Sequence, residues 1–278
     1  MSPFVRSSRF GTFLWPILAW VLALLFFFPI FWMVLTSFKT DADAVKPEFL
    51  FFFTPTLENY FNMTENYDYW RFAVNSGITS VFATLFTLFV GVPAAYAMAF
   101  NPSRHTKDIL LWMLSTKMLP AAAVLYPMTF LTKNMLGLFD THFLVILVLS
   151  LINLPIVIWM LFTYFKEIPK EIIEAGKMDG VSFWGEMGDI VLPLAWGGLA
   201  STALLCFIFC WNEAYWTVRL TTTDAATLSK LIEGNRAPEG LFFGRLSAVS
   251  TAAVGPIVVL GWFCQKQLVR GLTFGAVK

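Results

Sequence analysis

The residues with the clearest chemical pattern in this chain lie at positions 174–193, which read EAGKMDGVSFWGEMGDIVLP. Glutamate and aspartate dominate the charges of this stretch, and long apolar runs flank it on both sides. A helix that rests on lipid headgroups usually favours Lys and Arg, so the acids indicate a protein partner outside the bilayer. An interfacial helix on lipid remains the alternative. We call residues 166–194, which contain this stretch, the acidic loop.

The acidic loop is predicted to form two short helices, over 170–178 and 184–191. Pro169 suits the first helical position, where its missing N–H costs nothing. Gly180 follows an aspartate and predicts a turn, because glycine accepts positive φ. Ser182 suits the N-cap of the second helix. We expect that helix to end at the Leu-Pro pair that follows it and to lead into the next apolar run.

Lys117 is the one clear charge in the middle of an apolar run. A charge at bilayer depth costs about 2.5–3.5 kcal/mol on insertion scales, so its side chain is expected to face a partner or a wet cavity. It would then line a path or pair across a subunit interface. Snorkelling towards the headgroups, or a shift of the span that brings Lys117 nearer an end, explains the charge equally well.

A second group of polar residues has the composition of a carbohydrate site. Sugar recognition combines aromatic faces with amides and carboxylates that bind hydroxyl groups. The candidates for a solute path are Lys117, Asn75, Asn153, Trp211, Asn212 and Glu213. An interfacial aromatic belt is the alternative explanation for Trp211 and Trp216. Glu213 needs a partner at its span end, and Arg219 is a candidate.

The rest of the sequence offers no catalytic constellation. It contains no G-x-x-x-x-G-K-[ST], no H-E-x-x-H and no C-x-x-C pattern, so this chain is not expected to bind ATP or to be an enzyme. Cys206 and Cys210 share a helical face but have no histidine or carboxylate nearby, so we expect no metal site. We expect no cofactor on this chain. The net charge of +1 argues against nucleic acid as a partner.

The elements that position these residues are predicted to be membrane-spanning helices. Hydrophobic residues make up 58% of the chain and charged residues 13%, against about 25% charged in soluble domains. A span needs about 20 apolar residues. Six windows qualify, at 14–35, 72–100, 109–131, 143–165, 195–216 and 246–268. We therefore predict an all-α, polytopic protein whose residues 1–278 form a single transmembrane domain, with core spans at about 72–268.

An even number of spans puts both termini on the same side of the membrane. Ten lysines and arginines fall in the segments on the side of the termini, against eight on the other side. The positive-inside rule therefore predicts cytoplasmic termini and a cytoplasmic acidic loop.

Residues 174–193 resemble the EAA loop of bacterial ABC importer permeases. In that loop Glu-Ala-Ala is followed by Gly at the seventh position and by Ile-x-Leu-Pro at the seventeenth to twentieth. This chain has Glu174, Ala175, Gly180, Ile190, Leu192 and Pro193 at those spacings. It departs at the third position, where Gly176 replaces alanine and is expected to loosen the first helix slightly. In the family the loop is seated in a cleft of the ATP-hydrolysing subunit, which implies a coupling role for these residues and Asp179.

The resemblance extends over essentially the whole chain. The segments PIFWMVLTSFKT, WNEAYW and LVRGLTFGAVK look like the carbohydrate-uptake class, in its maltose-type second permease. Within that class YAMAF, KDILLWMLSTKMLP and NLPIVIWMLFTYFKEIPKEI are most similar to permeases of sugar-alcohol importers for mannitol and sorbitol. The resemblance implies the type I ABC importer permease fold with six transmembrane helices in the bacterial cytoplasmic (inner) membrane.

The resemblance also implies a set of partners and a mechanism. The chain would import a polyol or small sugar by alternating access. It would work with a dimer of ATP-binding subunits that hold ATP and Mg, an extracytoplasmic solute-binding protein and a second permease, which we expect to be non-identical. The tail at 271–278 is expected to reach the ATPases. The alternative is a secondary transporter or channel for a small polar solute, which would need ion-coupling carboxylates at the midplane, where the spans contain none.

Overall fold

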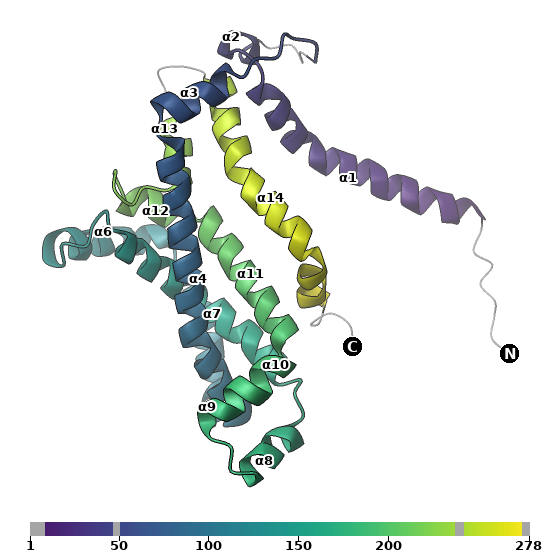
Figure 1. The fold of residues 1–278 in the computed structure, drawn as a ribbon, viewed down its shortest axis with the longest axis vertical. Coiled ribbons are helices and arrows are strands. Elements are labelled where there is room, and N and C mark those ends of the chain that lie inside the picture. The colour runs from purple at the N-terminus through teal and green to yellow at the C-terminus, as the bar shows by residue number, and fades with distance from the viewer. Residues whose placement is uncertain (1–8, 47–50, 237–241, 274–278) are drawn as a thin grey trace. The chain divides into compact units, whose positions relative to one another are not determined.

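The computed structural model describes residues 9–46, 51–236 and 242–273, with side chains from 15 to 265 within those ranges. Every regular element in these ranges is a helix, as the all-α prediction requires (Figure 1). By its internal packing the chain divides into two compact units. Unit 1 comprises Met1–Tyr67 and Asn235–Ala252, and unit 2 comprises Asp68–Gly234 and Ala253–Lys278.

Unit 1 contains three helices and the start of a fourth: α1 (Arg9–Ser37), α2 (Asp41–Ala44), α3 (Glu58–Asn66) and the first turns of α14 (Phe243–Thr273). Polar side chains connect these elements. The Asn59 amide donates to the carbonyl oxygens of Ser37 and Lys39 at 3.0 and 2.7 Å. The Asp41 carboxylate accepts from the backbone N–H of Gly244 at 3.2 Å, which satisfies one of the free donors at the start of α14.

The centre of unit 2 is a bundle of three long helices, α4 (Tyr69–Phe100), α7 (His142–Phe165) and α11 (Trp196–Asn212), which pack against one another (Figure 1). Small residues bring α4 and α7 together. A Cβ atom at Gly91 would lie 3.0 Å from Cγ1 of Val157, and the Ser150 hydroxyl donates across the interface to the carbonyl oxygen of Ala83 at 3.1 Å. Close approach at small residues is how helices associate in lipid, where apolar burial gives no advantage.

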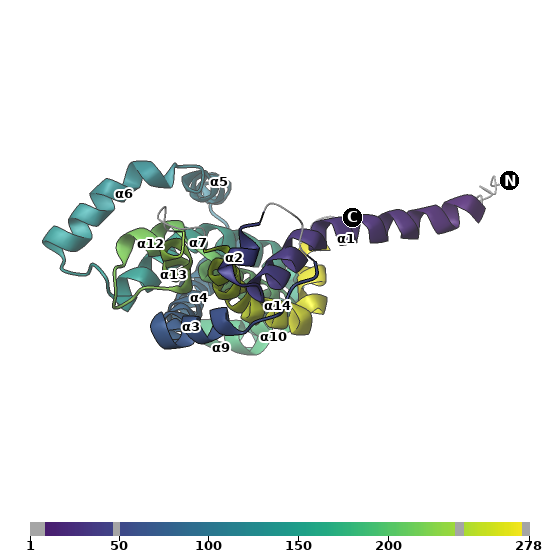
Figure 2. The ribbon, with the colours of Figure 1, turned by 90° about the horizontal axis from the view of Figure 1, so that it is seen from above.

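The predicted span at 109–131 is not one continuous helix. It is built from α5 (Thr106–Thr116), α6 (Ala121–Phe130) and the π-helical turn η1 (Leu131–Met135), with an 83° bend between α5 and the rest. Pro120 stands at the bend, because proline lacks the N–H that a continuing helix needs and disfavours helical geometry in the residue before it. The helix α6 projects to one side of α4 in both views (Figures 1 and 2).

The predicted span at 195–216 also differs from the structure. The helix α11 ends at Asn212, and the chain continues through two short helices, α12 (Tyr215–Leu220) and α13 (Leu228–Gly234). At its other end α11 meets the preceding helical segment Phe183–Leu194 at 84°. Trp216 therefore belongs to α12.

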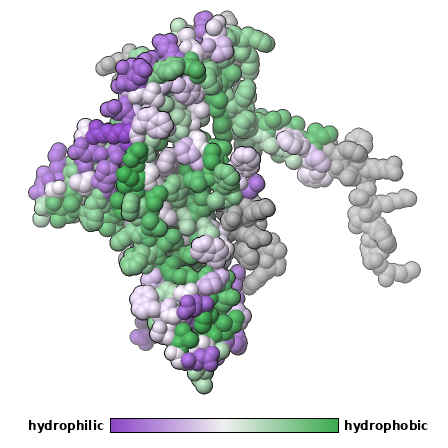
Figure 3. All heavy atoms as spheres, viewed as in Figure 1, coloured by the Kyte–Doolittle hydropathy of each residue, from purple (hydrophilic) through white to green (hydrophobic). Residues whose placement is uncertain are grey.

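Within the residues that the structure describes, four helices are long and apolar enough to cross a membrane: Trp15–Ser37, Tyr69–Phe100, His142–Phe165 and Phe243–Gln265. The number rises to six if each bent pair counts as one span. In Figure 3 apolar side chains cover much of the middle of the α4–α7–α11 bundle, whereas polar and apolar side chains are mixed at the end formed by α8 and α9. This pattern fits a bundle whose middle lies in lipid.

Candidate functional site

The acidic loop folds as a helical hairpin at one end of unit 2. Its helices are α8 (Lys170–Met178), α9 (Phe183–Gly185), the π-helical turn η2 (Glu186–Val191) and α10 (Leu192–Leu194). The first predicted helix is confirmed, but Pro169 is its N-cap and not its first helical residue, because the helix begins at Lys170. Gly180 has the positive φ of 78° that the predicted turn requires. The hydroxyl of Ser182 caps the second helix by accepting from the N–H of Gly185 at 3.3 Å.

The second helix is longer than the sequence predicts. The Leu192-Pro193 pair does not end it, because Pro193 lies in the first turn of α10, where a missing N–H is tolerated. The chain turns only at Ala195, where the 84° bend begins. The acidic loop thus joins α11 through a sharp corner.

The two arms of the hairpin are in close contact at Gly176, which is buried. A Cβ atom at this position would lie 2.7 Å from Cδ1 of Ile190 on η2. The prediction was that glycine here loosens the first helix. The structure instead uses the missing side chain to bring α8 and η2 together, and Ile173 is buried in the same region.

The outer surface of the hairpin carries most of the predicted coupling residues. Glu174, Ala175, Asp179, Gly180 and Pro193 are exposed, whereas Ile190 and Leu192 are half-buried. Two large apolar side chains are exposed beside them, Met178 at 87% and Trp184 at 72%. The hairpin therefore presents a mixed acidic and apolar surface to the solvent, which is the composition of a protein-binding surface.

The inner surface is fixed to α4 by a hydrogen bond that the sequence analysis did not find. The hydroxyl of Tyr96 donates to the carboxylate of Glu186, and the two residues are only 1% and 2% exposed. The Phe183 ring stands edge-on to the Tyr96 ring, with centroids 5.1 Å apart. The available signal was the spacing of Glu186 three residues after Phe183 and four before Ile190, which puts an acid on the apolar face.

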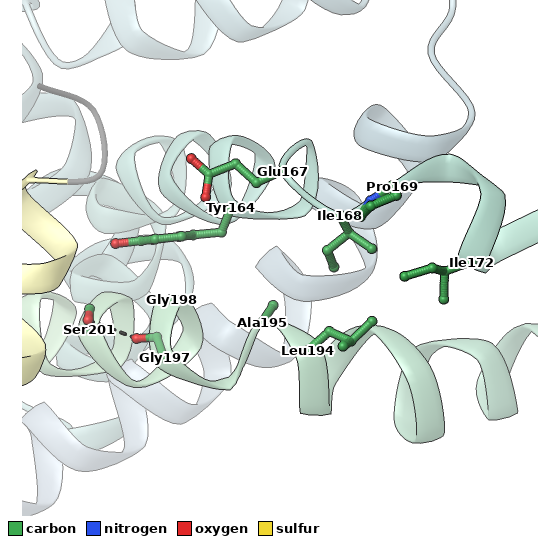
Figure 4. A pocket seen from close by; sticks show the side chains of 10 residues that line it. All are labelled: Tyr164, Glu167, Ile168, Pro169, Ile172, Leu194, Ala195, Gly197, Gly198 and Ser201. Atoms are coloured by element: carbon green, nitrogen blue, oxygen red, sulfur yellow. Dashed lines mark hydrogen bonds between the residues drawn. The ribbon is translucent and has the colours of Figure 1, made fainter. Parts of the chain in front are cut away.

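A cavity of about 430 Å³ lies beside the corner at Ala195 (Figure 4). It is lined by the end of α7, the start of α8 and the first turns of α11. The Tyr164 ring lies so close to the backbone of α11 that a Cβ atom at Gly198 would be 2.3 Å from its Cγ atom. In Figure 4 the Ser201 hydroxyl donates to the carbonyl oxygen of Gly197, at 2.8 Å. Side chains are therefore tightly packed where Tyr164 meets α11, and the cavity lies next to this contact.

Three of the predicted path residues come together at a second site. Lys117 lies at the C-terminal end of α5, and its Nζ atom is 3.4 Å from Oδ1 of Asn153. Asn153 is 2% exposed and donates from Nδ2 to the carbonyl oxygen of Leu149 at 2.9 Å. Lys117 itself is exposed. With Glu213 and Trp216 it lines a cavity of about 360 Å³.

Glu213 does not pair with Arg219, the candidate partner that the sequence analysis names. Its Oε1 atom accepts from the backbone N–H of Trp216 at 3.2 Å, which satisfies a free donor at the start of α12. Arg219 donates to the carbonyl oxygen of Tyr215 at 3.4 Å, and its guanidinium lies 4.2 Å from the centroid of the Tyr215 ring. The carboxylate of Glu213 therefore finds its partner in the backbone three residues further along the chain, as a helix cap.

The remaining path candidates do not line the cavity at Lys117. The Asn75 amide donates to the carbonyl oxygens of Asp224 and Ala226, each at 2.9 Å, and so holds a loop in place. The indole of Trp211 donates to the carbonyl oxygen of Ala253 at 3.1 Å. Asn212 is exposed, and its amide donates to the helix backbone four residues earlier at 2.9 Å.

The same loop is held by Asp140 at the end of unit 2 opposite the acidic loop. Its carboxylate accepts from the hydroxyl of Thr222 at 2.5 Å and from the N–H groups of Thr223 and Ala225 at 2.8 and 3.2 Å. Partial burial by itself raises the pKa of the Asp140 carboxyl, but these hydrogen bonds outweigh it and hold the pKa well below its ordinary value.

No group of three or more metal-binding side chains gathers in the parts of the chain that the structure describes. The side chains of the predicted ATPase-contacting tail at 271–278 lie outside the described residues, and so does the backbone of 274–278.

Comparisons with known proteins give consistent results. Residues 91–273 match a family described as "Binding-protein-dependent transport system inner membrane component". The chain is 31% identical, over 95% of both chains, to a probable ABC transporter permease protein of Sinorhizobium fredii. It is also 31% identical to the trehalose transport system permease SugB of Mycobacterium tuberculosis, over 90% of this chain and 92% of SugB.

A solved structure has the same fold. It is a bacterial ABC transporter involved in the import of the acidic polysaccharide alginate, and the two chains superpose with a TM-score of 0.75 at 22% identity. The superposition covers 96% of this chain and 99% of the other.

Proposed function

Because the chain belongs to the family of binding-protein-dependent transport system inner membrane components, we propose that it is a membrane-spanning permease of an ATP-driven carbohydrate importer. It has the type I ABC permease fold. Like its relatives it is a transport subunit and not an enzyme. The work of moving the solute must then come from ATP and Mg bound by a dimer of partner subunits.

The observation that carries the proposal is the two-sided construction of the acidic loop. Its outer surface offers Glu174 and Asp179 beside the exposed Met178 and Trp184, a surface that an ATPase cleft can grip. Its inner surface is bonded to α4 through Glu186. A force applied to the outer surface therefore reaches the bundle through the fold of the loop itself.

The solute path is proposed to pass the cavity at Lys117. The ammonium of Lys117, the carboxylate of Glu213 and the ring of Trp216 line it and provide the polar and aromatic contacts that a polyhydroxylated solute needs, while the buried Asn153 contacts the ammonium from behind. We assign mannitol or sorbitol as the solute on the sequence resemblance. Named relatives transport trehalose and maltose, so these disaccharides are the comparison solutes.

The assembly follows from the same assignment. The acidic loop and both termini face the cytoplasm of a bacterial cell, in its inner membrane. A solute-binding protein delivers the solute to the opposite face, and the solute passes between this chain and a second, non-identical permease by alternating access. The exposure of Lys117 supports this arrangement, because a charge that its own chain leaves open can serve a path between subunits.

The test is uptake by vesicles that contain this chain, the second permease and the ATPase dimer, with the binding protein outside. We expect ATP-dependent accumulation of labelled mannitol or sorbitol, and weaker accumulation of trehalose and maltose. Accumulation of the disaccharides alone would overturn the polyol assignment and keep the importer. Passage of solute at full rate through this chain without the ATPase would overturn the importer in favour of a channel or secondary transporter.

A further inference from the structure

Glu186, the buried acid on the inner surface of the acidic loop, is not part of the surface that the ATPase would contact. Glu186 is 2% exposed, so no partner can reach it without unfolding the loop. A buried carboxylate costs several kcal/mol in desolvation unless hydrogen bonds compensate, and an apolar side chain of similar size usually packs there at no such cost. The chain nevertheless places an acid here, opposite a tyrosine hydroxyl on α4. The hydrogen bond makes the contact between the loop and α4 directional, whereas apolar packing alone would let the two surfaces slide past each other.

We propose that the Tyr96–Glu186 hydrogen bond is the positioning contact through which movement of the acidic loop is transmitted to α4. The inference rests on the proposed function, since it assumes that a partner ATPase moves the loop. Tyr96 and Glu186 are positioning residues in this scheme, because neither touches solute or nucleotide.

The geometry of the loop makes this bond the point of transmission. The close contact of Gly176 with Ile190 fixes α8 against η2, so the two arms move as one body. The chain joins this body to α11 at the corner at Ala195, with the hollow of about 430 Å³ beside it, and the apolar side chains of Ile173 and Val191 pack in the same core as Tyr96. Apolar contacts such as Phe183 on Tyr96 tolerate sliding, whereas a hydrogen bond to a charged acceptor resists it because its energy depends on distance and angle.

The deciding variants change one atom or one charge. Tyr96→Phe removes the hydroxyl and keeps the ring, and Glu186→Gln keeps an oxygen that can accept from Tyr96. Glu186→Leu removes the acceptor and leaves an apolar side chain that the buried position tolerates. Tyr69→Phe is the matched control, because Tyr69 is a buried tyrosine at the opposite end of the same helix.

The measurement is the number of solute molecules imported per ATP hydrolysed by the complete complex in vesicles, together with co-purification of the ATPase. For Tyr96→Phe and Glu186→Leu we expect the ratio to fall about ten-fold, which is the order expected for loss of one hydrogen bond to a charged group. Tyr69→Phe should stay within about two-fold of the original chain, and Glu186→Gln should fall less than Glu186→Leu because its neutral amide oxygen still accepts from Tyr96. An unchanged ratio in both Tyr96→Phe and Glu186→Leu would overturn the proposal.

A second measurement separates this inference from the proposed function. Amide hydrogen exchange in the purified chain should be faster at residues 183–191 in Tyr96→Phe and unchanged in Tyr69→Phe, whether or not any solute is transported. Equal exchange in the two variants would overturn the bond as a positioning contact. Absence of ATP-dependent import by the original chain would instead overturn the proposed function and leave the exchange result standing.

Discussion

Two charges beside apolar helices are treated in opposite ways by this chain. Glu186 is buried, and its carboxylate is bound by Tyr96 from another helix. Lys117 is exposed, with one long hydrogen bond, 3.4 Å to Asn153, and its ammonium lies 5.9 Å from the centroid of the Phe209 ring. A charge satisfied inside its own chain can only connect parts of that chain. A charge left open can serve something that comes from outside, either a solute or a second subunit.

The backbone around each charge accounts for the difference. Glu186 is held inside by the register of its helix, which puts it between Phe183 and Ile190 on the inner face. Lys117 is the C-cap of α5, three residues before Pro120 at the break. There its ammonium lies near the C-terminal end of a helix, where the helix dipole favours a positive charge. Because the helix is broken here, the lysine side chain can stay exposed although the surrounding sequence is apolar.

The largest effect is expected from the turn that orients the outer surface of the acidic loop. Gly180 and Gly188 both have open space where a Cβ atom would be, but only Gly180 has positive φ, at 78°. Left-handed geometry costs an L-residue about 1–2 kcal/mol. Gly180→Ala should therefore reduce solute-stimulated ATP hydrolysis by the reconstituted complex about ten-fold. Gly188→Ala adds the same methyl group without the strain and is the control, and equal losses in both would contradict the prediction.

The next effect is expected at Lys117, and it should separate the open charge from the buried one. Lys117→Met removes a charge that costs about 2.5–3.5 kcal/mol at bilayer depth, so the variant should insert at least as well as the original chain. Import should fall several-fold, while hydrogen exchange in the acidic loop stays unchanged. Lys133→Met, at an exposed lysine on η1, is the control. Unchanged import in Lys117→Met would mean that the lysine only snorkels.

A smaller effect on transport, with a clear effect on stability, is expected at Asp140. Its carboxylate is fully engaged like that of Glu186 but lies away from the acidic loop. Asp140→Ala should lower the free energy of unfolding by about 1.5–3 kcal/mol, the range for hydrogen bonds to a charged group, and leave the import per ATP unchanged. A fall in that ratio would show that any engaged carboxylate affects coupling, and would weaken the distinction drawn for Glu186.

Asp140 also gives a pH dependence with a definite sign. Its folded-state pKa is depressed, so the stabilisation is fully present above the ordinary aspartate pKa of about 3.9 and is lost as the pH falls through the folded-state value. The melting temperature of the original chain should drop more steeply than that of Asp140→Ala as the pH is lowered below about 4. Parallel curves for the two proteins would contradict the assignment.

The sequence could predict what depends on neighbouring residues and not what depends on distant ones. The helix at 170–178 and the turn at Gly180 follow from local backbone preferences, and the structure confirms both. The count of apolar residues over 109–131 predicts one continuous span, because such a count does not respond to the missing backbone N–H of Pro120, where the structure bends. The partner of Glu186 lies 90 residues away, and no local pattern specifies it. For Glu213 the sequence suggests Arg219 as a candidate partner, whereas the structure shows the N–H of Trp216, three residues on, which follows a capping rule.

The smallest effect is expected from Gly176→Ala, where two terms of similar size oppose each other. Alanine in a helix interior is about 1 kcal/mol more favourable than glycine, so α8 alone should gain stability. The new methyl group would lie 2.7 Å from Cδ1 of Ile190, which must leave its present position. Moving a side chain off its preferred rotamer costs about 0.5–1.5 kcal/mol. Because Cδ1 is the far end of a flexible side chain, the two terms should nearly cancel.

Coupling in Gly176→Ala should therefore stay within about two-fold of the original chain, measured as solute imported per ATP hydrolysed. Gly176→Val is the comparison, since a branched side chain cannot be accommodated by a rotation of Ile190 alone and should separate α8 from η2. A strong loss in the alanine variant would mean that the contact between the two arms is as rigid as the Tyr96–Glu186 bond. Movement of the outer surface would then reach the Tyr96–Glu186 bond only while α8 and η2 move as one body, which is what the transmission through that bond assumes.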